Sequence, residues 1–347
     1  MINEPQTPRI SVVMSVYNGA KYLHYALHSI VNQTYKNFEF IIIDDGSTDE
    51  TWNILNKCCD DRLKLIRRNK NEGLVSGLNR GIEEARGEYI ARMDADDIAL
   101  PKRFETQVNF LDHNDKVVAL GTRAIRINDK GRIINDIVSI NDPKRVRLYL
   151  ERGFNPMIHS SIMMRKKIVR ELGGYRDAFK HAEDYDLWLR MLGLGDICNL
   201  RDRLMLYRSN ISGIRLNNII DSCHSHAYAF DCFQRRVRNE KEINREDFVA
   251  SCDVKGLEVY WLWNAVREML LLSEVSKAIE LLKEIIARDK NHIKAKIILF
   301  LLRSPAERWI SVCYNGYGHL RGWLSNLPFA SLLSMLKNIK VFLTNKR

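Results

Sequence analysis

The sequence predicts an α/β protein built on an open, mostly parallel sheet and followed by a helical region. Three observations lead to this prediction. Between residues 10 and 93, short apolar runs rich in β-branched residues alternate with segments of helical spacing. The apolar runs end in polar or acidic residues, as buried parallel strands do. From about residue 217 the alternation stops and only helical patterns remain.

The first three elements form a βαβ unit. Residues 10–16 (ISVVMSV) and 38–43 (FEFIII) are the two apolar runs. Between them, residues 22–33 carry apolar side chains at a helical spacing, namely Leu23, Ala26, Leu27, Ile30 and Val31. Two strands joined through a helix of this length can pair in parallel.

The alternation then continues along the chain. A helix begins near residues 47–49 (STD), whose side chains can cap free backbone amides and place negative charge at a helix start. A strand at 63–66, a helix at 77–85 and a strand at 89–93 follow. The pattern is typical of an open sheet that binds its ligands beyond the carboxyl ends of its strands.

Function is therefore expected just after residues 16, 43 and 93. Five carboxylates follow the last two of these positions: Asp44, Asp45, Asp94, Asp96 and Asp97. In a partly desolvated cleft they would repel one another, so a positive charge must compensate them. Carboxylate oxygens suit a hard divalent ion, which makes Mg²⁺ or Mn²⁺ the expected cofactor.

Composition excludes several other classes of protein. The 347 residues are 46% apolar and 28% charged, as in globular chains and unlike disordered or fibrous ones. The chain lacks a run of roughly 18 apolar residues, and its start (MINEPQTPRI) lacks a signal-peptide pattern, so we expect a cytoplasmic protein. Seven cysteines, an odd number, indicate reduced thiols.

Short motifs stand at the predicted strand ends and further along the chain. They read SVVMSVYN at 11–18, DDGSTD at 44–49, NEG at 71–73, GEYI at 87–90, DADD at 94–97, GGY at 173–175, EDYDLW at 183–188 and YR at 207–208. In this order and spacing they resemble the inverting glycosyltransferases of family 2, of bacterial type, which have the GT-A fold, a Rossmann-like open sheet. The resemblance covers roughly residues 8–215 and implies a hexosyltransferase that uses a nucleotide-sugar donor.

The resemblance places the nucleotide at the first two strand ends. Ser15 and Tyr17 would lie along the uracil of a uridine diphosphate donor, and Asp45 would accept a hydrogen bond from it. Two of these residues also have a structural interpretation: Tyr17 could pack in the core, and Asp45 could belong to a turn before Gly46.

The DADD segment resembles the DxD motif of the family. Asp96 would ligate the metal directly, Asp94 would contact the ribose or the metal's water shell, and Ala95 would lie at the nucleotide. A metal at this place stabilises the charge that develops on a leaving nucleoside diphosphate. The alternative is a solvated turn that caps the following helix.

Asp184 matches the position of the catalytic base in this family. A carboxylate within hydrogen-bond reach can remove the proton of an acceptor hydroxyl as the new bond forms. Direct displacement would invert the anomeric carbon, so that an α-linked donor gives a β-linked product. Glu183 would support Asp184 or bind the acceptor, and His159 lies where the family contacts the acceptor. Alternatively, Glu183 belongs to a charged helix start and His159 to the packing.

One segment departs from the family pattern. Members often place a His two residues after Tyr-Arg, near the metal or the diphosphate, whereas this chain has Arg208 followed by Ser209 and Asn210. Asn210 offers a carbonyl oxygen to a hard cation but no imidazole. The resemblance therefore does not imply a third protein ligand from this loop, and whether Asn210 contributes to the metal site stays open. Arg208 and Asn210 are candidates for acceptor binding or support.

We expect three regions: a catalytic domain at 1–216 that binds a nucleotide sugar, a helical appendage at 217–302 and a basic, aromatic tail at 303–347. Residues 300–347 hold seven Lys or Arg and one acidic residue, interleaved with aromatic residues. Such segments suit the plane of an anionic membrane interface. They would then give peripheral contact with the inner face of the membrane and favour a lipid-linked acceptor. The alternative is helix ends packed on the protein.

The leading hypothesis is a metal-dependent enzyme that moves a sugar from a nucleotide donor, UDP-linked, to a glycan or lipid-linked saccharide in surface polysaccharide synthesis. A nucleotidyltransferase is one alternative, but it would place a Gly-rich basic loop where this chain has YNGAK at 17–21. A nucleic-acid-binding module is another, favoured by the net charge of +11. Its phosphates would be repelled by the acidic cleft, so no nucleic acid is expected as a partner.

Overall fold

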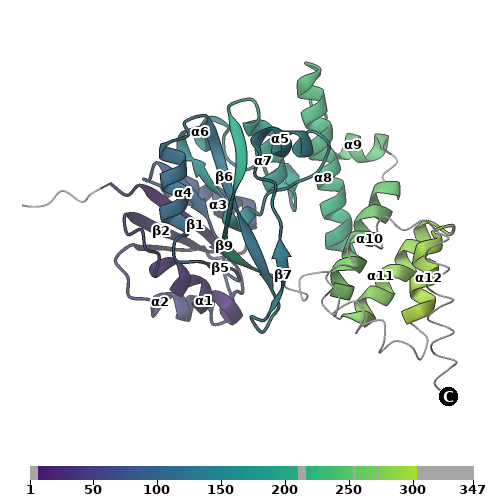
Figure 1. Ribbon diagram of the computed structural model, residues 1–347, viewed down its shortest axis with the longest axis horizontal. Coiled ribbons are helices and arrows are strands. Elements are labelled where there is room, and N and C mark those ends of the chain that lie inside the picture. The colour runs from purple at the N-terminus through teal and green to yellow at the C-terminus, as the bar shows by residue number, and fades with distance from the viewer. Residues whose placement is uncertain (1–6, 210–215, 253–254, 272–273, 303–347) are drawn as a thin grey trace, which may run out of the picture. The chain divides into compact units, whose positions relative to one another are not determined.

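Figure 1 shows the computed structural model, in which residues 7–209, 216–252, 255–271 and 274–302 are described. The chain divides into two compact units, Met1–Trp261 and Leu262–Arg347. The described part of the first unit holds a nine-stranded sheet with helices on both faces. The expected α/β fold, an open sheet followed by helices, is confirmed, with three of its parallel pairs in the first half of the sheet.

The first half of the sheet contains the four strands that the sequence predicted. β1 (Ile10–Val16) pairs in parallel with β2 (Phe38–Asp44) on one side and with β4 (Tyr89–Arg92) on the other. β3 (Leu63–Arg67) pairs in parallel with β2. Almost every residue of β1, β2 and β4 is buried, because helices cover both faces, and this explains the continuous apolar runs.

Crossover helices connect these strands: α1 (Ala20–Val31), α2 (Thr51–Asn56) and α3 (Leu74–Glu84). Successive residues of β1 point to opposite faces of the sheet. Val12 therefore packs in the core that contains α1, and Val13 packs in the core that contains α3. The strand ends are thus fixed from both sides, and the loops that follow them are held in place.

The second half of the sheet is mixed. Its strands are β5 (Ile98–Ala99), β6 (Val117–Ile127), β7 (Ile133–Ile137), β8 (Met163–Arg165) and β9 (Asp196–Arg208). β8 lies antiparallel between β4 and β6, whereas β9 is parallel to β6 and antiparallel to β5. β7 forms a hairpin with β6. The sequence analysis did not identify these five strands.

Short helices and turns connect the second half. They are α4 (Arg103–Asp112), α5 (Pro143–Leu150), η1 (His159–Ser161), α6 (Lys166–Glu171), η2 (Asp177–Phe179) and α7 (Glu183–Met191). α7 carries Trp188 and Leu187, which are fully buried in the same core as α3. This packing fixes the start of α7, where Glu183 and Asp184 stand.

The C-terminal region is helical, as expected. Its helices are α8 (Leu216–Val237), α9 (Arg245–Ser251), α10 (Lys255–Leu271), α11 (Val275–Arg288) and α12 (Ile293–Leu302). Among the described helices, none is both long enough and apolar enough to cross a membrane. The expected tail at 303–347 lies outside the described residues.

The division between the two units lies after Trp261, not at the expected boundary after residue 216. α8 belongs to the first unit because its aromatic side chains pack on the second half of the sheet region. His226 stacks on Tyr185 of α7 with ring centroids 3.9 Å apart, and Tyr228 stacks on Phe179 of η2 at 4.8 Å. α8 therefore supports the catalytic region directly.

Candidate active site

An acidic loop lies between β4 and β5. Carboxylate oxygens of Asp94, Asp96 and Asp97 all come within 4.8 Å of one another. The loop is held at the carboxyl edge of the sheet because the Met93 N–H donates to the carbonyl of Val13 (3.1 Å). The sequence placed these carboxylates at this edge, and the structure brings them together.

Asp97 has a structural environment. It is 1% exposed, and its carboxylate accepts hydrogen bonds from the Arg208 backbone N–H (2.7 Å) and from the Ser160 hydroxyl. Burial, together with Asp94 and Asp96, raises the pKa of Asp97 well above its usual range. Asp97 thus ties the acidic loop to β9 and to η1.

Asp94 and Asp96 have oxygens left for a ligand. Both are partly exposed, and Asp94 forms an ion pair with the buried Arg92. Burial and then the charge of Asp94 raise the pKa of Asp96 to about 6. A cluster of hard oxygen ligands with excess negative charge fits Mg²⁺ or Mn²⁺, so the residues present suit the expected metal.

A second carboxylate pair stands at the first two positions of α7. Asp184 accepts hydrogen bonds from the Asn155 side-chain amide (2.9 Å) and from the Tyr185 backbone N–H (2.6 Å). Burial raises the pKa of Asp184, despite these hydrogen bonds. Burial and then Asp184 raise the pKa of Glu183 to about 7. Glu183 can therefore exchange a proton near neutral pH.

His159 lies beside this pair. Its Nε2 is 2.8 Å from the Tyr175 hydroxyl, and its Nδ1 is 3.9 Å from a carboxylate oxygen of Glu183. Burial, and then the charge of Arg92, lower the pKa of His159 well below its ordinary value, so the imidazole is neutral. The structure therefore brings His159 together with Glu183, as a candidate for the same site.

Arg208 is held mostly by backbone groups. Its guanidinium donates to the carbonyls of Asp96 (2.8 Å) and Asn128 (2.8 Å) and lies 4.3 Å from the centroid of the Tyr22 ring. Arg208 therefore shapes the acidic loop from the β9 side. Asn210, the other candidate from this segment, lies outside the described residues.

Asp45 is enclosed by its own chain. Its carboxylate is 2% exposed and accepts hydrogen bonds from the backbone N–H groups of Glu72 (3.1 Å) and Gly73 (2.8 Å) and from the Arg68 guanidinium (3.1 Å). Gly73 has a φ of +94°, a conformation that glycine adopts without strain. The NEG segment thus folds over Asp45, an arrangement that the sequence analysis did not foresee.

The other proposed nucleotide residues lie near this loop. Tyr17 is 48% exposed, so the alternative of core packing does not describe its side chain. Ser15 faces α3, because a Cβ placed on Gly77 would lie 2.1 Å from the Ser15 hydroxyl oxygen. Ala95 adjoins the loop after β1, since a Cβ on Gly19 would lie 3.4 Å from the Ala95 Cβ.

The five carboxylates expected to converge separate into two groups. The Asp44 carboxylate is fully buried, accepts a hydrogen bond from the Ser47 N–H (3.1 Å) and lies 3.5 Å from the Arg67 Nε. Asp45 is paired with Arg68. Two arginines of the chain therefore compensate these two carboxylates, and only the carboxylates of the acidic loop remain to attract a cation.

Several residues of the site were missed by sequence reasoning. They are Arg92, Asn155 and Tyr175, each identified here only by its contact with a predicted residue. Asn155 lies in an irregular segment after α5, and its sequence context carries no chemical signal. Tyr175 belongs to the GGY motif, which marked the segment but not the role of its hydroxyl.

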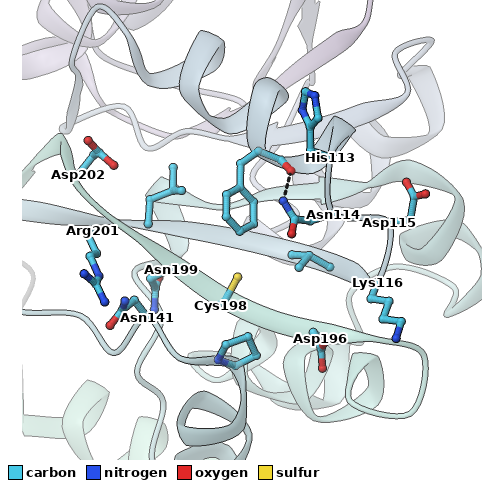
Figure 2. A pocket seen from close by; sticks show the side chains of 14 residues that line it. His113, Asn114, Asp115, Lys116, Asn141, Asp196, Cys198, Asn199, Arg201 and Asp202 are labelled. Atoms are coloured by element: carbon cyan, nitrogen blue, oxygen red, sulfur yellow. Dashed lines mark hydrogen bonds between the residues drawn. The ribbon is translucent and has the colours of Figure 1, made fainter.

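A cavity of about 720 Å³ lies apart from this site (Figure 2). Its 14 lining residues come from the end of α4, the starts of β6 and β9 and the segment before α5. The Asn114 amide there donates to the Phe110 carbonyl (2.8 Å). None of the lining residues belongs to the acidic loop or to α7, and acidic and basic side chains alternate along the wall, so the cavity has no dominant charge.

The fold is of the GT-A type. The chain belongs to glycosyltransferase family 2: residues 11–173 match the family described as Glycosyl transferase family 2. This membership selects the glycosyltransferase hypothesis over the two alternatives that the sequence left open.

Relatives agree with this assignment. A glycosyltransferase of Haemophilus influenzae without further characterisation is 31% identical over 293 residues, which cover 80% of this chain and 84% of the relative. The amylovoran biosynthesis glycosyltransferase AmsE of Erwinia amylovora is 34% identical over 206 residues, which cover 57% of this chain and 76% of AmsE.

Solved structures show the same fold. S. aureus TarS in complex with UDP-GlcNAc has a TM-score of 0.51 at 16% identity, covering 85% of this chain and 91% of that chain. The mannosyltransferase PcManGT from Pyrobaculum calidifontis, in complex with GDP-Man and Mn²⁺, has a TM-score of 0.51 at 17% identity, covering 90% of this chain and 88% of that chain.

Proposed function

We propose that this chain is a metal-dependent, inverting hexosyltransferase that moves a sugar from a uridine diphosphate donor to a hydroxyl of a glycan or lipid-linked saccharide, in surface polysaccharide synthesis. One observation carries the proposal: Asp94 of the acidic loop is close enough to the carboxylate pair of α7 for its charge to affect the pKa of Glu183. Burial and Asp184 raise the pKa of Glu183, and Asp94 of the acidic loop adds to this rise. In this proposal the donor binds at the acidic loop and the base belongs to α7.

Known proteins support the class of substrate. AmsE is named for amylovoran biosynthesis. TarS and PcManGT were solved with UDP-GlcNAc and with GDP-Man plus Mn²⁺, respectively. A nucleotide sugar and a divalent ion are therefore the first ligands to test here.

In this proposal Asp96 and Asp94 hold Mg²⁺ or Mn²⁺. The ion would stabilise the negative charge of the departing nucleoside diphosphate. Asp97 keeps the loop in shape through its buried contacts with Arg208 and Ser160. The chain thus divides its three aspartates between ligand binding and support.

Asp184 acts as the base. The Asn155 amide and the Tyr185 N–H orient its carboxylate, so that one oxygen can accept the proton of the acceptor hydroxyl. Attack on the face opposite the diphosphate inverts the anomeric carbon, and an α-linked donor gives a β-linked product. Glu183 and the neutral His159 help to bind the acceptor or to support Asp184.

The nucleotide is proposed to lie along the ends of β1 and β2. Tyr17 offers an exposed ring on which the uracil can stack, while Ser15 and Ala95 line the neighbouring backbone. Asp45 contributes in one of two ways: by a direct hydrogen bond to uracil, or by holding Glu72 and Gly73 in the loop that encloses the base.

A panel of nucleotide sugars tests the proposal. Hydrolysis of UDP- and GDP-linked sugars is measured with Mn²⁺, with Mg²⁺ and with EDTA, for the wild type and for Asp96→Ala. We expect turnover of a UDP-linked sugar that EDTA and Asp96→Ala abolish. Full turnover in EDTA would overturn metal dependence, and turnover of GDP-sugars alone would overturn the uridine assignment.

We also propose that the acceptor is presented at an anionic membrane surface. This rests on the sequence of residues 303–347, with its basic and aromatic composition. Co-sedimentation with anionic vesicles is expected for the full chain and not for a chain that ends at residue 302. Equal sedimentation of the two chains would contradict it.

A further inference from the structure

Arg92 is a buried cation at the end of β4. The residue is 3% exposed, and its backbone is fixed on both sides. Its N–H donates to the Ile162 carbonyl (2.9 Å), and its carbonyl accepts a hydrogen bond from the Arg103 guanidinium (2.8 Å). The position of the Arg92 side chain is therefore set by the sheet and not by a mobile loop.

The guanidinium of Arg92 points into the candidate active site. It forms an ion pair with Asp94, while its buried Nε has no hydrogen-bond partner among the described residues. The Asp94 carboxylate is one of the two that the proposed function gives to the metal. Arg92 and a divalent cation would therefore be drawn to the same oxygens.

Arg92 also lies within electrostatic reach of the other carboxylates. Burial raises the pKa values of Asp96, Glu183 and Asp184, and the Arg92 charge opposes the rise in each case. The Arg92 charge thus stabilises the ionised forms of Asp96 in the acidic loop and of Glu183 and Asp184 in α7. Among the described residues, Arg92 thus combines an ion pair with Asp94 and an electrostatic effect on both carboxylates of α7.

The neighbouring candidates for a counter-charge are engaged otherwise. The Arg208 guanidinium donates to backbone carbonyls, and the buried His159 is neutral. Within the described residues, Arg92 is the buried guanidinium that pairs directly with an aspartate of the acidic loop. Without a metal, this single charge offsets part of the repulsion among the carboxylates.

We propose that Arg92 is a positioning residue that competes with the divalent cation for Asp94 and so makes tight metal binding depend on the nucleotide. The inference rests on the proposed function. Without a nucleotide, Arg92 holds Asp94 and repels the cation. The diphosphate of a donor supplies negative charge that attracts both the cation and Arg92, so the two positive charges can then be accommodated together.

The coupling between Mn²⁺ and UDP tests this inference. Free Mn²⁺ is measured by electron paramagnetic resonance during titration of the full chain, with and without UDP. For Arg92→Met we expect tighter binding of Mn²⁺ alone, because a competing positive charge beside Asp94 is removed. The expected gain is about 10- to 100-fold, similar in size but opposite in sign to the usual effect of removing a group that supports a metal ligand. The factor by which UDP tightens Mn²⁺ binding should fall correspondingly, and reciprocally for Mn²⁺ acting on UDP.

Two further variants control the result. Arg92→Lys keeps a positive charge beside Asp94 and should therefore bind Mn²⁺ alone less tightly than Arg92→Met does. Arg190→Met removes a comparable buried guanidinium, which pairs with the fully buried Asp186 at 2.9 Å, and should leave Mn²⁺ binding unchanged. The folding of Arg92→Met is checked by its thermal transition, and Arg92→Gln, which keeps a hydrogen-bonding amide, is measured as a second uncharged variant.

The outcomes separate this inference from the proposed function. Suppose that the wild type binds Mn²⁺ and UDP together, and that the folded, uncharged Arg92 variants bind Mn²⁺ alone no more tightly than the wild type does. The competition between Arg92 and the cation is then overturned, while the proposed metal site is retained. If the wild type binds neither ligand, the proposed function itself fails. Weaker Mn²⁺ binding in both uncharged variants would show that Arg92 supports the metal site, which also overturns the competition.

Discussion

The replacement Asp184→Asn tests the base directly, because it removes the charge and keeps the shape of the side chain. The new amide can still accept from the Tyr185 N–H, but its NH₂ group would face the Asn155 amide, now 2.9 Å away. Asn155 must then rotate, and its hydrogen bond from the Met157 N–H (3.1 Å) is lost. We expect this rearrangement to cost about 1 kcal/mol of folding free energy.

The effect on catalysis should be much larger. A positioned base contributes typically about 10²- to 10⁴-fold to the rate, which corresponds to about 3–5 kcal/mol of activation free energy. UDP binding should change less than about twofold, since Asp184 lies on the acceptor side. Initial rates of sugar transfer and calorimetric UDP binding, measured on the same preparation, separate the two effects.

Asp186→Asn is the matched control on the same helix. Asp186 is fully buried and pairs with Arg176 and Arg190, so its replacement leaves Arg190 without a carboxylate partner, while Arg176 keeps its pair with Glu242. We expect a loss of about 3–5 kcal/mol in stability and a transfer rate per folded molecule within about fivefold of the wild type. If Asp184→Asn transfers sugar within tenfold of the wild type, Asp184 is not the base.

Three further results are expected. Burial and Asp184 raise the pKa of Glu183 to about 7, and burial raises the pKa of Asp184, so transfer should slow as falling pH protonates this pair; a rate that is flat from pH 5 to 8 would contradict this. Burial and Asp94 raise the pKa of Asp96 to about 6, so protons should compete with Mn²⁺ below pH 6 in calorimetric titrations; constant affinity across that range would argue against the acidic loop as the site. Gly77→Ala would place a methyl group 2.1 Å from the Ser15 hydroxyl oxygen and should lower stability by about 1–3 kcal/mol. Gly256→Ala, which meets no atom within 4 Å, serves as its control in thermal unfolding, and equal transitions for the two variants would refute the packing argument.

The first half of the sheet could be predicted because burial on both faces leaves a clear pattern. β1 and β2 are apolar along almost their whole length, and their ends are followed by turn-forming residues. The carboxyl edge of a parallel sheet then brings Asp94, Asp96 and Asp97 to one place. The acidic loop follows from sequence and topology alone.

The second half could not be predicted in the same way. β9 contains exposed charged residues at 201–203, which interrupt its apolar pattern, and β5 has only two residues. β6 and β9 pair in parallel although about 70 residues separate them along the chain. Partner choice over such a distance depends on packing of the whole unit, which local periodicity does not encode.

The enclosure of Asp45 also required the three-dimensional structure. Sequence reasoning can place a carboxylate after a strand, but not which backbone amides will reach it. Gly46 and Gly73 both have a positive φ, which turns the loop after β2 and the loop before α3. The Gly73 N–H of the second loop then reaches the Asp45 carboxylate of the first. The same limit applies to Asn155, whose contact with Asp184 joins segments 29 residues apart.

The antiparallel pairing of β4 with β8 marks the boundary between the parallel first half of the sheet and its mixed second half. The residues proposed for the nucleotide and the ion all lie before residue 100. Asn155, His159 and Asp184, which are proposed for the acceptor side, lie shortly before or after β8. Under the proposed function, changes in donor choice and changes in acceptor choice would fall on separate stretches of the gene. Libraries for engineering a new linkage can therefore be confined to the later stretch, while the earlier one is kept constant.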